Sequence, residues 1–141
     1  MKIKIVKVKD DIELPQYQTK GSAAVDLHST IDKVLQAKTI HSIPTGLRVE
    51  IPDGYELQIR QRSGLAKKGV IVPNSPGTID SDFRGEMHIL LLNLSTEDIE
   101  IKKGDRIAQA VLNKFEKIDW EEVEELSETE RGSDGFGSTG L

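Results

Sequence analysis

The chain has 141 residues, the size of one ordinary domain that can bury a core without disulfides or structural metals. It contains no cysteine, so disulfide frameworks, thiolate zinc sites and cysteine nucleophiles are excluded. The formal net charge is -5, with eight carboxylates against one lysine between Glu116 and Glu130, which argues against direct nucleic-acid binding.

The first segment, MKIKIVKVKDD, alternates lysine with aliphatic residues and lacks the apolar run of a signal peptide. No later stretch approaches membrane-spanning length. We therefore expect a soluble cytoplasmic protein, in the host cytoplasm if it is viral, with no membrane partner.

Ile3 and Ile5 are followed by Val6 and Val8, a phase slip of one residue that predicts a β-bulge.

Alternating apolar residues then predict a series of strands. Residues 47–51 and 55–59 flank the turn PDG and predict a hairpin. Residues 87–94 are nearly all apolar, as in a central strand covered on both faces. Residues 99–101 and 107–112 flank the turn KKGD and predict another strand pair.

Helical signals are few. Residues 65–68 predict one helical turn, and Trp120, Val123 and Leu126 have helical spacing in a short segment that leads into a glycine-rich tail. Many short strands with regular turns predict a closed barrel or a jelly-roll-like sandwich. Aromatic residues make up 4% of the chain, so the core must be mainly Ile, Leu and Val. Such a domain often pairs with copies of its own chain.

Three segments could carry chemistry. In PNSPGTIDSDFRGE, Asp80 follows a predicted strand and could orient and deprotonate a water, whereas Asp82 would hold the turn or a neighbouring arginine. Alternatively the segment is a β-hairpin whose aspartates only stabilise turns.

In QRSGLAKKG an arginine, a hydroxyl and a glycine stand just before the helical turn. The basic residues that gather here, Arg60, Arg62, Lys67 and Lys68, could suit a compact anion such as a nucleoside phosphate. Arg62, Ser63 and the first helical amides could cradle a phosphate. The alternatives are a solvated turn and an ordinary serine N-cap.

The tail combines Arg131 with glycines at 132, 135, 137 and 140 and one aromatic residue, Phe136. A tail of this composition is typically disordered because glycine has the largest ordering cost. Phe136 could nevertheless stack on a base, and Arg131 could bind phosphate with two hydrogen bonds.

Taken in order, five segments resemble the five motifs of the homotrimeric dUTP pyrophosphatases (dUTPases): AAVDLHS, RSGLA, GTIDSDFRGE, GDRIAQAVL and RGSDGFGSTG. The resemblance implies an all-β protomer, a distorted jelly-roll-like β-barrel, in a homotrimer with a swapped C-terminal arm. Residues 1–126 would form the barrel, and residues 127–141 would form a flexible arm that closes over a neighbouring active site.

The activity implied is hydrolysis of dUTP to dUMP and pyrophosphate, with Mg2+ as cofactor. This reaction limits uracil incorporation into DNA and supplies dUMP for dTMP synthesis. Asp80 would activate the water that attacks the α-phosphorus, and Arg131 would act as an arginine finger. Asp26 would touch the metal through water, since the triphosphate holds most of it.

The resemblance also implies a set of substrate-binding residues. The uracil edge would be read by Asn74, Gly77, Thr78 and Ile79, and Phe83 would pack on the deoxyribose. The phosphates would be held by Arg62, Ser63, Gly64 and Gln109. The base would be capped by Phe136, with Gly137, Ser138 and Thr139 closing on the outer phosphates.

The chain departs from the family pattern at four places. Phe83 replaces a tyrosine, Gln61 a proline and Asp134 a glycine, and the stretch between Ala66 and Asn74 is one residue short of many relatives. Asp134 adds negative charge near the phosphates, which would weaken binding or slow arm closure.

Two other functions remain open. A dCTP deaminase-type enzyme shares this fold and nucleotide class but usually lacks the glycine-rich arm. A catalytically silent barrel that binds a nucleotide or a protein is the alternative of a different class.

His28, His41 and His88 are scattered without metal-ligand spacing, so we assign them no role. Arg106 is a candidate partner for Asp26.

Overall fold

The computed structural model describes residues 1–140. Its eleven strands and one helical turn all lie within the first 114 residues. The strands are β1 (Lys4–Lys7), β2 (Val25–His28), β3 (Lys33–Leu35), β4 (Ile40–Pro44), β5 (Leu47–Glu50), β6 (Tyr55–Arg60), β7 (Val70–Ile71), β8 (Gly77–Ile79), β9 (His88–Asn93), β10 (Ile99–Ile101) and β11 (Arg106–Lys114). The helix is α1 (Ser63–Ala66). The predicted all-β class is confirmed, and the helical turn predicted at residues 65–68 is present but begins two residues earlier.

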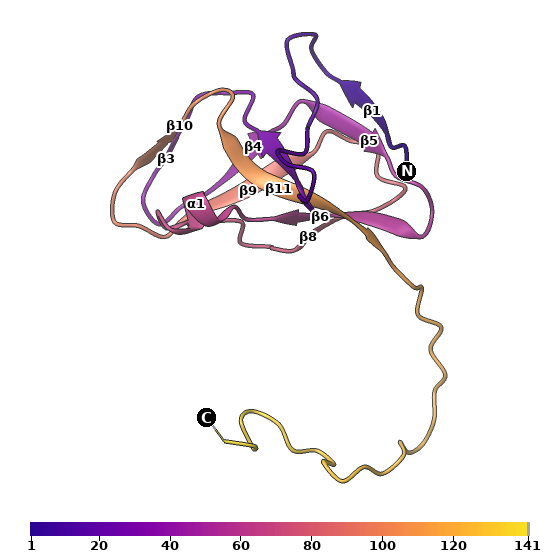
Figure 1. The fold of residues 1–141 in the computed structure, drawn as a ribbon. Coiled ribbons are helices and arrows are strands. Elements are labelled where there is room, and N and C mark those ends of the chain that lie inside the picture. Colours follow the sequence, from indigo (N-terminus) through magenta and orange to yellow (C-terminus); the bar gives the residue numbers. More distant parts are fainter. Residues whose placement is uncertain (141) are drawn as a thin grey trace.

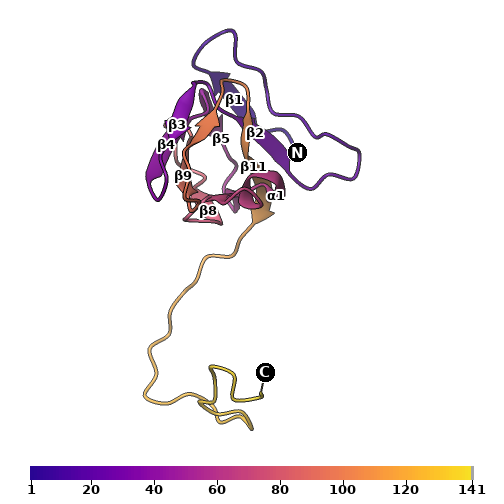
Figure 2. The same cartoon turned by 90° about the vertical axis from the view of Figure 1, so that its left-hand side faces the viewer.

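The strands form antiparallel sheets around one interior. The largest sheet has the order β2-β11-β6-β8, a second has the order β4-β9-β7, and β1-β5 and β3-β10 form two further pairs. Figure 2 looks nearly along the barrel, with strands on all sides of the interior. This arrangement agrees with the predicted distorted jelly-roll-like barrel.

The interior is aliphatic. Its largest fully buried side chains include Leu27, Leu35, Ile43 and Ile89, and no aromatic side chain is fully buried among the described residues. The predicted Ile, Leu and Val core is therefore confirmed. In residues 1–140 there is no helix that has both the length and the apolar character needed to cross a membrane.

The polar side chain of Asn93 lies inside this core. It is 0% exposed, and its Nδ2 atom donates hydrogen bonds of 2.8 Å to the carbonyl oxygens of Leu35 and Glu97. Its Oδ1 atom accepts bonds from the amide and hydroxyl of Ser95. Because every polar atom is satisfied, Asn93 joins the end of β9 to β3 at little desolvation cost.

The predicted hairpins are wrong. After β5 the chain crosses to another sheet, where β6 pairs with β11 and β8. The chain likewise crosses to that sheet between β10 and β11. Residues 73–86 form no hairpin because they contain one strand, β8, which pairs with β6. The turns themselves are present, with positive φ at Gly54 and Gly104. A turn reverses the chain, but it does not determine which strand becomes the partner.

Strand β1 contains no bulge. Its four residues pair in unbroken register with β5, so Val6 and Val8 stay exposed while Ile3 and Ile5 pack against the core. Lys4 donates a hydrogen bond to Glu50 across this pair, which lowers the pKa of the Glu50 carboxyl. The irregularity in pairing occurs instead between β2 and β11, beside Ile107.

Strand β9 is central in its sheet, as predicted, but only one of its faces is covered. Ile89, Leu91 and Asn93 point into the core, whereas Leu90 on the other face is 37% exposed. Ile40 on the neighbouring β4 is also exposed and pairs in register with Leu92. The protomer thus presents apolar side chains on the outer face of β4 and β9.

The segment that follows β11 leads away from the barrel (Figure 1). Within residues 115–140 there is neither helix nor strand, so the helix suggested by the spacing of Trp120, Val123 and Leu126 is wrong. Trp120 is 84% exposed and Leu126 is 87% exposed. The predicted arm, residues 127–141, ends with Leu141, which lies outside the described residues.

Candidate active site

A cleft of about 440 Å³ opens beside the sheet that contains β2, β11 and β6. It contains five of the predicted site residues, namely Asp26, Arg62, Ser63, Gly64 and Gln109. These residues come from the first, second and fourth of the sequence motifs and meet because β11 pairs with both β2 and β6. The rest of the lining consists of Gln18, Ser22, Ala23, Ala24, Arg60 and Val111.

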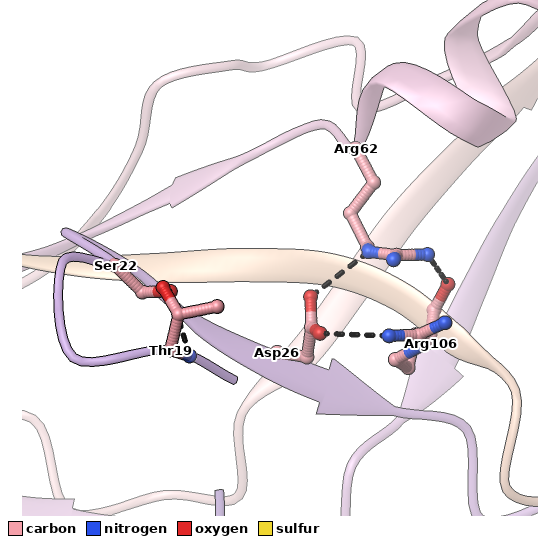
Figure 3. Close-up of polar contacts among 5 residues, drawn as sticks. All are labelled: Thr19, Ser22, Asp26, Arg62 and Arg106. Carbon is pink, nitrogen blue, oxygen red and sulfur yellow. Dashed lines mark hydrogen bonds and ion pairs between the residues drawn. The ribbon is translucent and has the colours of Figure 1, made fainter. Parts of the chain in front are cut away.

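Asp26, which lines this cleft, contacts two arginines (Figure 3). Its Oδ1 atom accepts a hydrogen bond of 2.9 Å from Nε of Arg62, and its Oδ2 atom lies 3.5 Å from Nη1 of Arg106. The Asp26 side chain is 11% exposed, so both pairs are partly shielded from water. The predicted pairing of Arg106 with Asp26 is confirmed, whereas the pairing of Arg62 with Asp26 was not predicted.

Arg62 is fixed by a second contact. Its Nη1 atom donates a hydrogen bond of 3.2 Å to the backbone carbonyl of Arg106, so the start of β11 also holds the guanidinium (Figure 3). Arg62 is also the N-cap of α1 and makes no capping bond through its side chain. The alternative that Ser63 caps this helix is therefore wrong, because Ser63 is the first helical residue. The first amides of a helix have no acceptor within it, which leaves Ser63 and Gly64 able to donate to a ligand.

Gln109 ties the loop before α1 to the sheet. Its Nε2 atom donates a hydrogen bond of 2.9 Å to the backbone carbonyl of Gln61. In the sheet, Gln109 pairs with Asp26 on one side and with Arg60 on the other. Residues paired in this way have side chains on one face of the sheet. Asp26, Gln109 and Arg60 therefore form a row across three strands.

The predicted base-binding and catalytic segment lies elsewhere on the protomer. Asp80 directly follows β8, as expected, and is exposed, but it does not line the cleft. Thr78 and Ile79 belong to β8, and the side chain of Asn74 lies over Gly77, with Nδ2 3.0 Å from the position of a Cβ atom there.

Phe83 folds over Gly85. A Cβ atom at position 85 would lie 2.6 Å from the Cζ atom of the Phe83 ring, closer than any side chain allows. Phe83 is 40% exposed, so the rest of the ring is available for contact. Glycine at position 85 therefore sets the resting position of this ring.

The arm residues form a third, separate group. Arg131 donates from Nε to the backbone carbonyl of Asp134 at 2.8 Å, a contact within the arm. Phe136 is fully exposed and has a positive φ. Gly137, Ser138 and Thr139 follow in turns. Figures 1 and 2 both show this segment away from the barrel, and neither Asp80 nor an arm residue lines the cleft, so one protomer does not bring the three groups together.

Comparison with known proteins identifies the family. The dUTPase family model matches residues 10–140. A deoxyuridine 5'-triphosphate nucleotidohydrolase of Nautilia profundicola is 55% identical over 141 residues, covering 99% of both chains. The chain belongs to the dUTPase family. A second relative of that name, from Fusobacterium nucleatum, is 49% identical over 143 residues and covers 99% of this chain and 97% of its own.

Solved dUTPases share the fold. A mutant dUTPase of Staphylococcus bacteriophage 80alpha, solved with dUpNHpp, superposes with a TM-score of 0.90 at 27% identity and covers 99% of both chains. A second mutant of that phage enzyme with dUpNHpp also gives a TM-score of 0.90, at 28% identity. The barrel and the path of the chain are therefore those of the dUTPase family.

Among the residues that line the cleft, Asp26 supplies the one carboxylate that could face a magnesium ion. Residues 1–140 contain no group of three or more His, Asp or Glu side chains able to cage a metal. Asp26 is a single carboxylate whose oxygens are already engaged by arginines. Mg2+ commonly uses one or two carboxylates, several waters and the phosphates of a substrate. The donor set therefore fits a metal held mainly by a triphosphate.

One wall of the cleft was missed from the sequence. The hydroxyls of Thr19 and Ser22 are hydrogen-bonded at 2.9 Å and close the loop before β2 (Figure 3). Ser22 and Gln18 line the cleft. The only available signal was the turn-forming run TKGS, which by itself indicates a loop without a function.

Proposed function

We propose that this chain hydrolyses dUTP to dUMP and pyrophosphate by in-line attack of water on the α-phosphorus. The observation that carries the proposal is the cleft in which Arg62, Ser63, Gly64 and Gln109 lie together. Guanidinium, hydroxyl and free amide donors suit phosphate oxygens. Family membership and the names of the relatives support dUTP as the substrate.

The proposed enzyme is a homotrimer. In one protomer the cleft is lined neither by Asp80 nor by the arm, which leads away from the barrel. Three copies related by symmetry would let a cleft, a loop and an arm from different chains meet in each of three sites. The exposed apolar residues Ile40 and Leu90, together with Trp120 and Leu126 beyond β11, are suited to burial between copies.

Within such a site, the side chains have distinct roles. Asp80 accepts a proton from the attacking water, and Arg62 and Gln109 hold phosphate oxygens. Arg131, delivered by the arm, neutralises charge that develops in the transition state. When bound, Mg2+ would neutralise phosphate charge and polarise the α-phosphorus, with Asp26 holding it through water. Placement and positive charge supply most of the rate in phosphoryl transfer.

The base would be selected by backbone contacts. The edge formed by Gly77, Thr78 and Ile79, with Asn74 above it, offers fixed donors and acceptors to uracil. Cytosine differs in donor and acceptor character at two ring positions and would leave polar groups unpaired, at about 1–3 kcal/mol for each buried group. The methyl group of thymine would be excluded by close approach of the same backbone.

The physiological role would be to limit uracil incorporation into DNA and to supply dUMP for dTMP synthesis. This role places the enzyme where nucleotides are made, and for this chain we propose the cytoplasm. Cell fractionation with an antibody against the protein tests the location, and recovery in the membrane or secreted fraction would contradict it.

A single assay tests the activity. The purified protein is incubated with each deoxynucleoside triphosphate and Mg2+, and pyrophosphate and ammonia are measured. We expect pyrophosphate from dUTP only. Release of ammonia from dCTP would instead indicate a dCTP deaminase-type enzyme, and the absence of both products would indicate a barrel that only binds.

A further inference from the structure

One cationic side chain in the cleft has no role in the function proposed above. Arg60 ends β6, is exposed, and lines the same cleft as Arg62, Ser63 and Gln109. It pairs in register with Gln109, which in turn pairs with Asp26, so its side chain emerges on the face of the sheet that carries these residues.

Arg60 differs from Arg62 in that no carboxylate pairs with its positive charge. The guanidinium of Arg62 is paired with Asp26 at 2.9 Å. Among the ion pairs that residues 1–140 form, none involves Arg60. Its bonded partner is neutral, since Nη2 of Arg60 donates to Oε1 of Gln58 at 2.6 Å. Arg60 therefore brings a positive charge into the cleft that no carboxylate of the chain offsets by direct contact.

A chain of hydrogen bonds on the same face orients this guanidinium. The Nε2 atom of Gln58 donates to Oε1 of Glu56 at 2.8 Å, and Nδ2 of Asn113 donates to the same oxygen at 3.1 Å. Glu56 and Asn113 pair in register between β6 and β11. Glu56 fixes the side chain of Gln58. The side-chain amide oxygen of Gln58 therefore orients Arg60 and leaves the other guanidinium donors free.

We propose that Arg60 is a further substrate-binding residue, which contacts the triphosphate chain in the cleft with its unpaired guanidinium. The inference rests on the proposed function and adds a residue to that site. A guanidinium is a preferred donor to phosphate oxygens, and an orienting contact reduces the entropy lost on binding. The positive charge of Arg62 is paired with the carboxylate of Asp26. Arg60 adds a positive charge to the cleft that is not paired in this way.

The test compares Arg60→Gln and Arg60→Lys with the wild-type chain. Binding of dUpNHpp with Mg2+ is measured by calorimetry, and deoxyuridine, which has no phosphate, is measured as a competitive inhibitor. We expect Arg60→Gln to weaken dUpNHpp binding about tenfold, the effect of one charge-assisted hydrogen bond. Deoxyuridine inhibition should be unchanged, and Arg60→Lys should recover part of the lost affinity.

Arg48→Gln is the matched control. Arg48 is exposed on β5, away from the cleft, and its replacement changes the net charge by the same amount. The inference is overturned if Arg60→Gln binds dUpNHpp as tightly as Arg48→Gln does. It is also overturned if deoxyuridine inhibition weakens by the same factor as dUpNHpp binding, because Arg60 would then act through the fold. Wild-type turnover of dUTP is measured first, so failure of the proposed function appears there, separately from either result.

Discussion

Asp26 and Arg62 lie 36 residues apart in the sequence, both line the cleft, and a hydrogen-bonded ion pair of 2.9 Å joins them. The pair links β2 to the loop before α1 and orients the guanidinium that faces the proposed phosphate site. Because the carboxylate also contacts Arg106, one residue fixes two cations and two strands.

Asp26→Asn should therefore affect both stability and substrate binding. We expect the free energy of unfolding to fall by about 1–2 kcal/mol, a value discounted from that of a fully buried pair because both arginines are partly exposed. The KM for dUTP should rise, because Arg62 is no longer held in one orientation. Urea denaturation and steady-state kinetics measure the two effects. Asp53→Asn, which removes an exposed carboxylate paired with Lys117, is the control, and equal behaviour of the two variants would contradict the prediction.

Asp80→Asn should separate binding from turnover. If Asp80 accepts a proton from the attacking water, its amide analogue keeps the shape of the site but loses the base. We expect kcat to fall by about 10²–10⁴-fold, the usual contribution of a general base, with little change in the Kd for dUpNHpp. Asp82→Asn, two residues further on, should retain turnover close to that of the wild type. Near-normal kcat in Asp80→Asn would remove Asp80 from the mechanism.

Gly85→Ala should alter sugar discrimination through Phe83. The added methyl group would lie 2.6 Å from the ring, so the ring must leave its resting position. If Phe83 packs on the deoxyribose, the preference for dUTP over UTP should fall by about tenfold or more, since a misplaced apolar contact costs about 1–3 kcal/mol. The ratio of kcat/KM for the two nucleotides measures this preference. An unchanged ratio would mean that Phe83 does not contact the sugar.

Asn93→Ala should destabilise the barrel without changing its chemistry. The substitution leaves the carbonyl of Leu35 and the amide of Ser95 without their buried partner. We expect the free energy of unfolding to fall by about 3 kcal/mol, with kcat retained below the melting temperature. Thermal denaturation measures the change, and Thr96→Ala, on the exposed turn that follows β9, is the control. A loss no greater than that of Thr96→Ala would show that the buried hydrogen bonds of Asn93 contribute little.

The sequence was informative where a local pattern has one structural meaning. Alternating apolar residues identified the strands because side chains alternate across any β-strand, whichever strand lies beside it. The position of Asp80 directly after β8 was predicted for the same reason. The five motifs together identified the family, although each fragment by itself had an ordinary alternative.

Partner choice could not be predicted in this way. The turns at Gly54 and Gly104 were recognised, yet the strands that they join pair with strands far away in sequence. The ion pair of Arg62 with Asp26 and the placement of Arg60 in the cleft depend on those distant pairings. The helical spacing of Trp120, Val123 and Leu126 was misleading because these side chains have no core in the protomer to pack against.

Complementation between two inactive variants tests the shared site most directly. Asp80→Asn with an intact arm is co-expressed with a chain that ends at Glu130, and mixed assemblies are purified with two different affinity tags. If Asp80 and Arg131 reach each site from different chains, every mixed trimer should contain one intact site of its three and recover about a third of wild-type activity. Activity no higher than that of the two variants purified separately would contradict a site built from several chains.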